Sequence, residues 1–274
     1  DNYLPGYSAM KEKERVVFFL RDGLSAAEKE RMAAYGADMN KYLDSGNEAR
    51  IKKAYESRDP RLQMAVITPY AQYNGASSGI AHTYTLRWPY RGSDSAEPFD
   101  IRTDTNDKFY YLWRKFVPEG LEQTERDTYG LDIPLIRYAE VLLLKAEALN
   151  EWGSTHESEA IRCVNEVRRR AGHVELNNAT YPATKVNGQS DLRERIRNEY
   201  YWEIGGEDSM YFHELRWGTW KDKKFDNNRN GLMQMWGETT YTWYWLGDQC
   251  WSWPIPAKEM EMNSNSEQNE GWIN

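Results

Sequence analysis

Residues 133–152 carry the most sustained apolar pattern of the chain, IPLIRYAEVLLLKAEALNEW. Apolar side chains recur there at helical spacing, and further apolar residues cover most of the remaining surface. A helix that is apolar nearly all round is usually an interior helix. Pro134 suits a first helical turn, and Gly153 follows the last periodic residue. The pattern therefore predicts a buried helix that begins near Pro134 and ends before Gly153.

A second helix is predicted directly after the first. Ser154 with Glu157 three residues later has the form of a capping box. A stripe of small apolar residues follows, and Gly172 marks the end; the stripe comprises Ala160, Val164, Val167 and Ala171. Two antiparallel helices joined by a tight loop form an αα-hairpin, the unit of tetratricopeptide-like solenoids.

Helices are also predicted on either side of this pair. Ser25 and Glu28 form another capping box, and residues 47–55 read as a short helix. Ser190 is expected to cap a later helix that ends at Gly205. Its buried face consists of Leu192, Ile196, Tyr200 and Ile204.

Strand signals are short. The run from Val16 to Leu20 predicts either a strand or a buried extended segment, and residues 62–67 predict a strand after Pro60. Residues 239–253 predict a β-hairpin around Gly247 and Asp248, with Trp243 and Trp245 on one face. A polar tail with one short helical turn is expected over 258–274.

The stretch 69–131 has no sustained period but many Gly, Ser, Pro and aromatic residues. Long loops in a compact domain are usually functional or disordered, and the aromatic content argues against disorder. We therefore expect helical structure over 25–57, a loop-rich segment over 58–131, a helical core over 132–218, and a hairpin and tail over 236–274. The predicted fold class is mainly α, with tetratricopeptide-like helix pairs, a long irregular loop-rich segment and small β-hairpins.

The amino-acid composition limits the classes of ligand and partner that the protein can bind. The chain has 12 Trp and 19 Tyr, and their flat rings with polar handles suit either sugar stacking or simple packing. A net charge of −8 without a basic block argues against nucleic acid or an anionic membrane as partner. The four His show no metal-ligand spacing, so neither a metal nor a cofactor is expected. Cys163 and Cys250 are far apart in sequence, and Cys163 is expected to be a buried free thiol.

Several ordered blocks resemble the SusD/RagB family of glycan-capturing lipoproteins from the outer membrane of Bacteroidetes-type bacteria. The blocks that carry the resemblance are RDPRLQMAVITP (58–69), IRYAEVLLLKAEALNEWG (136–153), AIRCVNEVRRRAG (160–172), IRNEYYWEIGGED (196–208), YFHELRWG (211–218) and WPIPAKEMEMNSNSEQNEGW (253–272). The resemblance implies that residues 1–274 correspond to a single SusD-like C-terminal region. Family members begin with a signal peptide and a lipidated Cys, so the lipid anchor is expected in an N-terminal part.

The resemblance also implies a function in nutrient uptake and polysaccharide utilisation. The helical face would dock on a TonB-dependent, SusC-like outer-membrane transporter as a lid, and loops would bind an oligosaccharide or polysaccharide. WSWPIP matches a recurrent family motif, so Trp251 and Trp253 are expected to be packed. Trp236, Trp243 and Trp245 remain open as exposed alternatives.

The best candidate for sugar binding is the segment YTLRWPYR, residues 84–91. Sugars need an exposed aromatic ring beside amide or charged side chains. Trp88 is the predicted platform, and packing in the core is its alternative role. The other predicted ligands are Tyr84 or Tyr90 as a second wall, Arg87 or Arg91 as a hydroxyl ligand, and then Tyr73 and Asn74.

Two other functions are compatible with the sequence. A glycosidase would need two carboxylates across a cleft, but Glu140 with Glu147, or Glu199 with Glu203, sit on predicted helices and are expected to form ion pairs. No nucleophile elbow or phosphate-binding glycine loop occurs, so we expect no enzymatic activity. A helical-repeat module that binds protein without sugar affinity is the second alternative.

Overall fold

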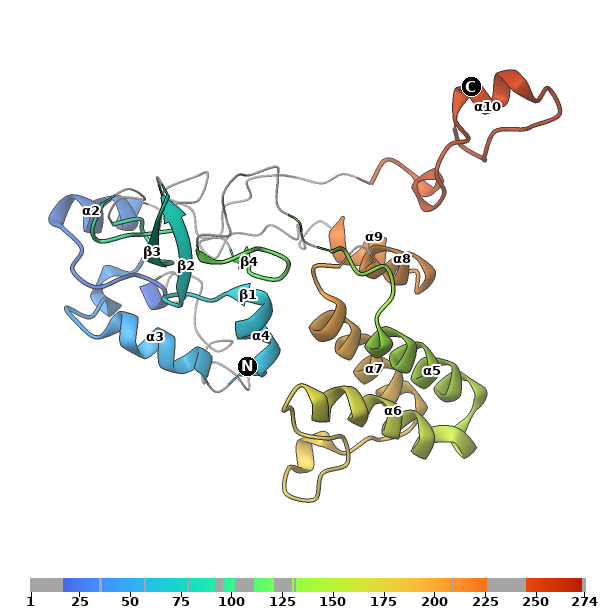
Figure 1. The fold of residues 1–274 in the computed structure, drawn as a ribbon, viewed down its shortest axis with the longest axis horizontal. Helices are drawn as coiled ribbons and strands as arrows, with labels where there is room; N and C mark the ends of the chain where they lie inside the picture. Colours follow the sequence, from blue (N-terminus) through green and yellow to red (C-terminus); the bar gives the residue numbers. More distant parts are fainter. Residues whose placement is uncertain are drawn as a thin grey trace. The chain divides into compact units, whose positions relative to one another are not determined.

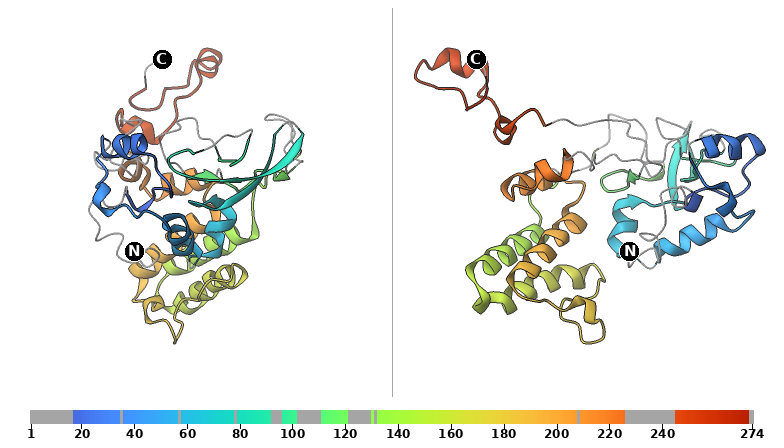
Figure 2. Two further views of the ribbon diagram at one scale, coloured as in Figure 1. Left: turned by 90° about the vertical axis from the view of Figure 1, so that its left-hand side faces the viewer. Right: turned by 180° about the vertical axis from the view of Figure 1, so that it is seen from behind.

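The computed structural model describes residues 17–34, 36–56, 58–77, 79–91, 96–101, 111–120, 130, 132–207, 209–225 and 245–272. The chain divides into two compact units, Asp1–Met210 and Tyr211–Asn274. The described part of the first unit is mainly helical, with short strands (Figures 1 and 2). This agrees with the predicted fold class. That residues 1–274 correspond to a single C-terminal region of a longer protein stays a prediction.

Two short helices near the N-terminus of the first unit confirm the helical prediction for 25–57. They are α2 (Ala26–Ala34) and α3 (Asn47–Glu56), with a 3₁₀ turn at Met39–Lys41 between them. The capping box forms as predicted, because the Ser25 backbone N donates to Glu28 Oε2 at 2.8 Å and Glu28 N donates to Ser25 Oγ at 3.3 Å. Both helices are held by fully buried side chains, Met32 and Ile51.

The apolar run that ends at Leu20 is buried, but it is not extended. Residues 17 and 18 are helical, and Leu20 N donates to Val17 O at 3.2 Å. Val17, Phe19 and Leu20 are each at most 2% exposed. Burial of this run was therefore predicted correctly, whereas the extended backbone was wrong.

The strand predicted for residues 62–67 is wrong over most of its length. Residues Pro60–Ala65 form helix α4 instead, and only Val66–Ile67 form a strand, β1. Asp59 caps α4 by accepting from Arg61 N at 2.9 Å, and Pro60 occupies the first turn, where its missing N–H leaves no bond unmade. The cap and the proline outweigh the apolar run that suggested a strand.

The loop-rich segment contains a regular hairpin. Strands β2 (Gln72–Ser77) and β3 (Ile80–Thr85) pair antiparallel with Tyr73 opposite Tyr84. A second pair, β1 with β4 (Leu112–Trp113), places Val66 opposite Trp113. Gly75 is required in the hairpin, since a methyl group there would lie 2.9 Å from the Tyr84 ring. Small β elements were predicted, but of these four strands only β1 falls within a predicted strand, residues 62–67.

Three long helices form the other part of the first unit. Helices α5 (Tyr138–Trp152), α6 (Glu157–Arg170) and α7 (Gln189–Ile204) lie side by side in both figures. Short 3₁₀ turns at Ser154–His156 and Pro182–Thr184 join them. The predicted buried face of α7 is confirmed, because its four stripe residues are at most 1% exposed. The αα-hairpin formed by α5 and α6 is confirmed as well.

Helix α5 differs from its prediction in two ways. It begins at Tyr138 rather than near Pro134, and it ends before Gly153 as expected. It is also not an interior helix. Leu143 and Ala146 are fully buried, but Val141 and Leu144 on the other side are 46% and 42% exposed. The apolar pattern is wider than the face that α6 and α7 cover.

Two predicted helix caps are absent. A 3₁₀ turn occupies Ser154–His156, so α6 begins at Glu157 without a side-chain cap. Helix α7 begins at Gln189, one residue before the predicted cap Ser190. Its first turn is held instead by Asp191, whose carboxylate accepts from Asn187 N at 2.8 Å.

The described part of the second unit consists of short helical segments. Helix α8 (Ser209–Arg216) leads into it, followed by α9 (Trp220–Lys224), a 3₁₀ turn at Asp248–Trp251, and α10 (Ala257–Met262). Aromatic rings pack edge to face from Tyr211 through Trp220 and Phe225 to Trp245. The short helix predicted in the polar tail is confirmed.

The predicted hairpin over 239–253 is wrong where it can be followed. Its second strand is the 3₁₀ turn Asp248–Trp251, and residues 239–244 with Trp236 and Trp243 lie outside the described residues. The Asp248 carboxylate accepts a hydrogen bond from Trp245 Nε1 at 3.1 Å, which is a contact within a turn rather than across a hairpin. The ring centroids of Trp251 and Trp245 lie 5.0 Å apart, so Trp251 packs on another ring as expected. Trp253 was also expected to be packed, but it is 72% exposed.

Candidate functional site

A buried cluster of ion pairs organises the first unit around Glu203 of α7. Its carboxylate, only 2% exposed, accepts from Arg137 Nη1 at 2.8 Å and from Arg170 Nη2 at 2.5 Å, and Arg61 Nη1 lies 3.2 Å away. These arginines come from the segment before α5, from the end of α6 and from α4. One carboxylate therefore fixes three elements.

The cluster extends along α7 to Glu199. Its fully buried carboxylate lies 2.7 Å from Arg168 Nε and 2.8 Å from Arg61 Nη1. Arg61 in turn pairs with Asp59 at 2.6 Å. The predicted ion-pair role of Glu199 and Glu203 is confirmed.

Glu207 closes the cluster at the other end. It accepts hydrogen bonds from Arg137 at 2.7 Å and from Lys115. Burial alone would raise the pKa of Glu207, but these bonds outweigh it and hold the pKa below its ordinary value. Burial would lower the pKa of Arg137, yet its bonds to Glu207 and Glu203 hold that pKa above its ordinary value. Both groups therefore stay charged at neutral pH.

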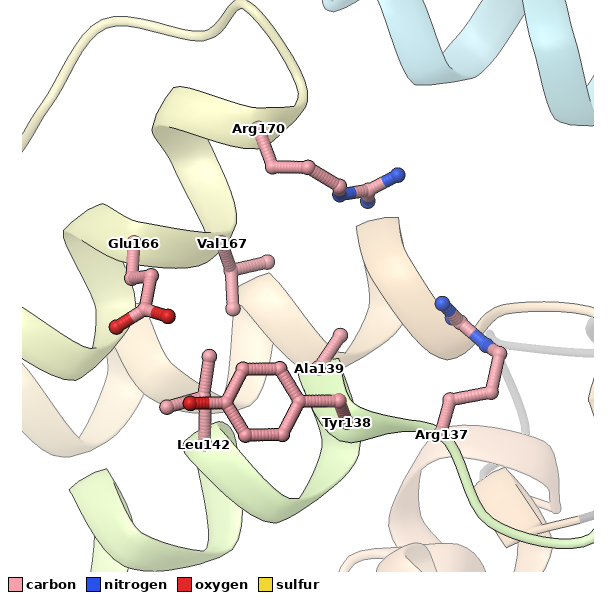
Figure 3. Close-up of a pocket in the computed structure, with 7 residues that line it drawn as sticks. All are labelled: Arg137, Tyr138, Ala139, Leu142, Glu166, Val167 and Arg170. Carbon is pink, nitrogen blue, oxygen red and sulfur yellow. The ribbon is translucent and has the colours of Figure 1, made fainter.

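A pocket of about 380 Å³ opens beside this cluster, between α5 and α6. We call it the Tyr138 pocket; its lining is Arg137, Tyr138, Ala139, Leu142, Glu166, Val167 and Arg170 (Figure 3). Leu142 and Val167 are buried and form the apolar wall of the pocket. Tyr138 is 68% exposed, and its ring lies beside Leu142. An open aromatic ring over an apolar base is a suitable surface for the C–H face of a sugar.

Hydrogen-bonding groups line the rim of the Tyr138 pocket. Within the described part of the chain, neither the Tyr138 hydroxyl nor the Glu166 carboxylate makes a hydrogen bond, and Arg170 bonds only to Glu203. Glu166 lies at one end of the pocket, and Arg170 and Arg137 lie at the other (Figure 3). The pocket thus combines apolar walls with a few polar groups that are available to a ligand.

A smaller hollow of about 130 Å³ shares Arg137 and Arg170 with the Tyr138 pocket. We call it the basic pocket, because four of its lining residues are cationic and one is acidic. The lining is Arg61, Met64, Ala65, Lys115, Arg137, Arg170, Trp202 and Glu203. Trp202 stacks on His173 with ring centroids 5.8 Å apart and is 39% exposed. The two pockets meet at the paired arginines.

Three of the four aromatic residues predicted to contact sugar lie elsewhere and are enclosed. Trp88, Tyr84 and Tyr73 are 2%, 9% and 8% exposed. The Tyr73 hydroxyl donates to Pro118 O at 2.7 Å, and the Tyr84 ring packs on Phe99. Their burial favours packing, the alternative role for Trp88, over a stacking platform.

The remaining predicted ligands lie nearer the surface. Arg91 and Asn74 are exposed, and Tyr90 is half-buried. Arg91 N donates to Asp100 Oδ2 at 2.7 Å, Asn74 Oδ1 accepts from Thr83 at 3.3 Å, and Arg87 pairs with Asp100. The structure does not gather these side chains around a common hollow among the described residues. Sugar binding by Tyr90, Arg91 and Asn74 stays a prediction.

Sequence reasoning missed the residues that line the open pocket. Tyr138 falls on the apolar stripe of α5 and was assigned to the core, and Arg170 ends a run of three arginines with no distinguishing motif. Trp113, 53% exposed, was one aromatic among many. Its ring needs Gly206, because a methyl group there would lie 2.9 Å from a ring carbon.

Several other features bear on the chemistry. No group of His, Cys, Asp and Glu suited to a metal ion occurs among the described residues. Cys163 is a buried free thiol as predicted, and Cys250 is free and half-buried. None of the helices in the described ranges combines the length and the apolar character that a membrane span requires.

Helices α5, α6 and α7 form a helical scaffold with an open pocket between α5 and α6. The model of the SusD family matches residues 18–272, and the chain belongs to this family. The resemblance inferred from the ordered sequence blocks is therefore confirmed.

Individual proteins that resemble this chain are also SusD or SusD-like proteins. The chain is 36% identical over 104 residues to the SusD-like protein P38 of Formosa agariphila, covering 38% of this chain and 20% of that protein. It is 28% identical over 161 residues to the starch-binding protein SusD of Bacteroides thetaiotaomicron, covering 58% and 25%. A solved SusD-like protein from Bacteroides fragilis superposes with a TM-score of 0.54 at 21% identity, covering 95% of this chain and 46% of that one. The chain thus spans less than half of each of these relatives.

Proposed function

We propose that this protein captures oligosaccharides without covalent chemistry and passes them to an outer-membrane transporter. The observation that carries the proposal is the match of the SusD family model over residues 18–272. One relative is named for starch binding. We propose the same general class of ligand, a glycan, for this chain.

The Tyr138 pocket supports sugar binding. Ligand pockets typically occupy about 300–1,000 Å³, and a pocket of about 380 Å³ suits one or two sugar rings. The exposed Tyr138 ring can stack on a pyranose, while Arg170 and Glu166 can bond to hydroxyl groups. Affinity is expected to be modest, because sugar hydroxyls lose water on binding.

One of the two carboxylate pairs considered for a glycosidase, Glu199 with Glu203, supports a non-catalytic role. A glycosidase needs two carboxyl groups on either side of an accessible glycosidic bond. Glu199 and Glu203 are instead buried and paired with Arg168 and Arg137. Groups committed in this way hold the scaffold together.

A protein partner is supported by the segment before α5. Ile133, Leu135 and Ile136 are 77%, 89% and 74% exposed, and exposed apolar clusters often mark protein interfaces. We propose that this segment contacts a TonB-dependent, SusC-like transporter at the cell surface. A lipid anchor in an N-terminal part would hold the protein at the outer membrane. The same exposure also favours the second candidate, a protein-interaction module without sugar affinity.

A glycan array probed with the full chain separates these functions. Binding to at least one oligosaccharide, without release of reducing ends from the polysaccharide, is the expected result. Appearance of reducing ends would show glycosidase activity. Co-purification with a SusC-like transporter from cells, without any glycan bound on the array, would leave only the interaction module.

A further inference from the structure

We propose that the Tyr138 pocket selects acidic saccharides, with the anionic group of the sugar held by Arg170 and its ring lying on Tyr138. This inference rests on the proposed function and adds to it a ligand class. The ligand chemistry is a carboxylate or sulfate carried on a sugar ring.

Arg170 is the cation best placed to meet such a group. Its side chain is 60% exposed, and its only bond within the described residues joins Nη2 to Glu203 Oε2 at 2.5 Å. That bond fixes the guanidinium and leaves its other N–H donors without a bond to the described residues. A fixed planar guanidinium binds carboxylate and sulfate oxygens well, since it can donate two parallel hydrogen bonds.

The other cations of the basic pocket contribute charge rather than direct contacts. Arg61 bonds to Asp59 through both Nε and Nη2, and Lys115 Nζ bonds to Glu203 O, Gly205 O and Glu207. The ion-pair cluster as a whole contains one more cation than carboxylates; its members are Arg61, Lys115, Arg137, Arg168 and Arg170 against Asp59, Glu199, Glu203 and Glu207. Glu166 balances this surplus but lies at the opposite end of the Tyr138 pocket, so the positive charge is concentrated at the arginine end, where it favours an anion.

The opposite end of the pocket fixes the orientation of the ligand. Glu166 lies there, one helical turn before Arg170 on α6 (Figure 3). A carboxylate repels an anionic group but accepts hydrogen bonds from hydroxyl groups. The acidic group of a sugar is therefore directed to Arg170, its hydroxyls to Glu166, and its C–H face to the Tyr138 ring between them.

Isothermal titration of the full chain tests the ligand class. The probes are an oligogalacturonate, an oligoglucuronate and a sulfated galactan oligosaccharide, each beside its carboxyl-reduced or desulfated counterpart. We expect at least one acidic probe to bind about tenfold more tightly than its neutral counterpart. Comparison of the uronates with the sulfated probe shows which anionic group is preferred. Equal binding of acidic and neutral counterparts in every pair would overturn the proposal.

Arg170→Gln tests the residue, with Arg169→Gln as its matched control. Arg169 is the neighbouring residue on α6, is 64% exposed and makes one ion pair, with Glu175 at 2.9 Å. We expect Arg170→Gln to abolish the acidic preference and Arg169→Gln to retain it. If the two variants change the acidic preference equally, the effect is one of net charge and the site assignment is wrong.

Tyr138 is tested in the same titration. Tyr138→Ala should weaken binding of the acidic probe about tenfold, since stacking on an aromatic ring is lost. Tyr181→Ala, at another exposed tyrosine (53%), should leave binding unchanged. Unchanged binding by Tyr138→Ala would contradict the proposal. Tight binding of neutral oligosaccharides only would also refute the acidic ligand but leave the proposed function standing. Failure to bind any glycan, acidic or neutral, would refute both.

Discussion

Glu203 Oε1 accepts a hydrogen bond from Arg137 Nη1 at 2.8 Å, and this pair joins α7 to the residue directly before α5. Arg137 also donates to the Glu203 carbonyl at 2.8 Å. Its backbone is extended, with φ −110° and ψ 148°, so the helix cannot begin before Tyr138. The pair therefore lies at the start of α5 and at the edge of the Tyr138 pocket.

Removal of the Glu203 charge should be costly. Glu203→Gln removes the counter-charge of Arg170 and one of the counter-charges of Arg137 and of Arg61, and breaking a buried ion-pair cluster in this way typically costs about 3 kcal/mol. Urea denaturation followed by circular dichroism measures the loss. Glu151→Gln is the control, since Glu151 pairs with Arg193 at 2.6 Å but is 44% exposed, and its loss should cost at most about 1 kcal/mol. Equal losses for the two variants would show that the buried cluster adds no more than an exposed pair.

Acid should destabilise the protein through carboxylates of the same cluster. Burial alone would raise the pKa of Glu207 and of Asp59. Hydrogen bonds from Arg137 outweigh burial at Glu207 and hold its pKa below the ordinary 4.5, and hydrogen bonds from Arg61 hold the pKa of Asp59 below the ordinary 3.8. The unfolded chain therefore takes up these protons first as the pH falls. The stabilisation is complete above the ordinary values and is lost as the pH falls through the lower values of the folded state.

The free energy of unfolding, measured by urea denaturation between pH 7 and pH 3, checks this sign. It should decline below about pH 5, and Glu207→Gln should make the decline shallower. Stability that rises with acidity over this interval would be incompatible with the depressed pKa values.

Neighbouring leucines of α5 should differ sharply in their contribution to stability. Leu143 is fully buried, so Leu143→Ala should cost about 2–5 kcal/mol. Leu144 is 42% exposed, and Leu144→Ala should cost less than about 1 kcal/mol. Thermal and urea denaturation of both variants measure the two losses in the free energy of unfolding. Similar large costs at both positions would mean that α5 is covered on all sides, as its sequence pattern suggested.

Trp88 should act as a core residue. Its ring is 2% exposed, so Trp88→Ala should lower the free energy of unfolding by about 3–5 kcal/mol. Trp113→Ala, at an exposed tryptophan (53%), should cost less than half as much in the same urea titration. A Trp88→Ala protein with unchanged stability but no glycan binding would restore the stacking role that the sequence suggested.

The parts of the fold that depend on local periodicity could be predicted from the sequence. The stripe of α7 and the capping box at Ser25 depend only on spacing within one helix, and both form as expected. The end of α5 also follows from one residue, Gly153. Such features need no knowledge of distant partners.

Other features depend on contacts between residues far apart in sequence. The residue at the start of α5, Arg137, bonds to Glu203, 66 positions away, and no local pattern reveals that pair. In α4, the Asp59 cap overrides an apolar run that suggested a strand. The tertiary fold likewise decides the exposure of Trp88, which is buried, and of Tyr138, which is exposed. An aromatic residue shows in sequence that it can stack, but the tertiary fold decides what it faces.

A crystal structure of the full chain with its tightest-binding oligosaccharide tests the account most directly. We predict a sugar ring lying on Tyr138 between α5 and α6, with its anionic group hydrogen-bonded to Arg170. A saccharide bound at another surface, with the Tyr138 pocket holding only water, would contradict it.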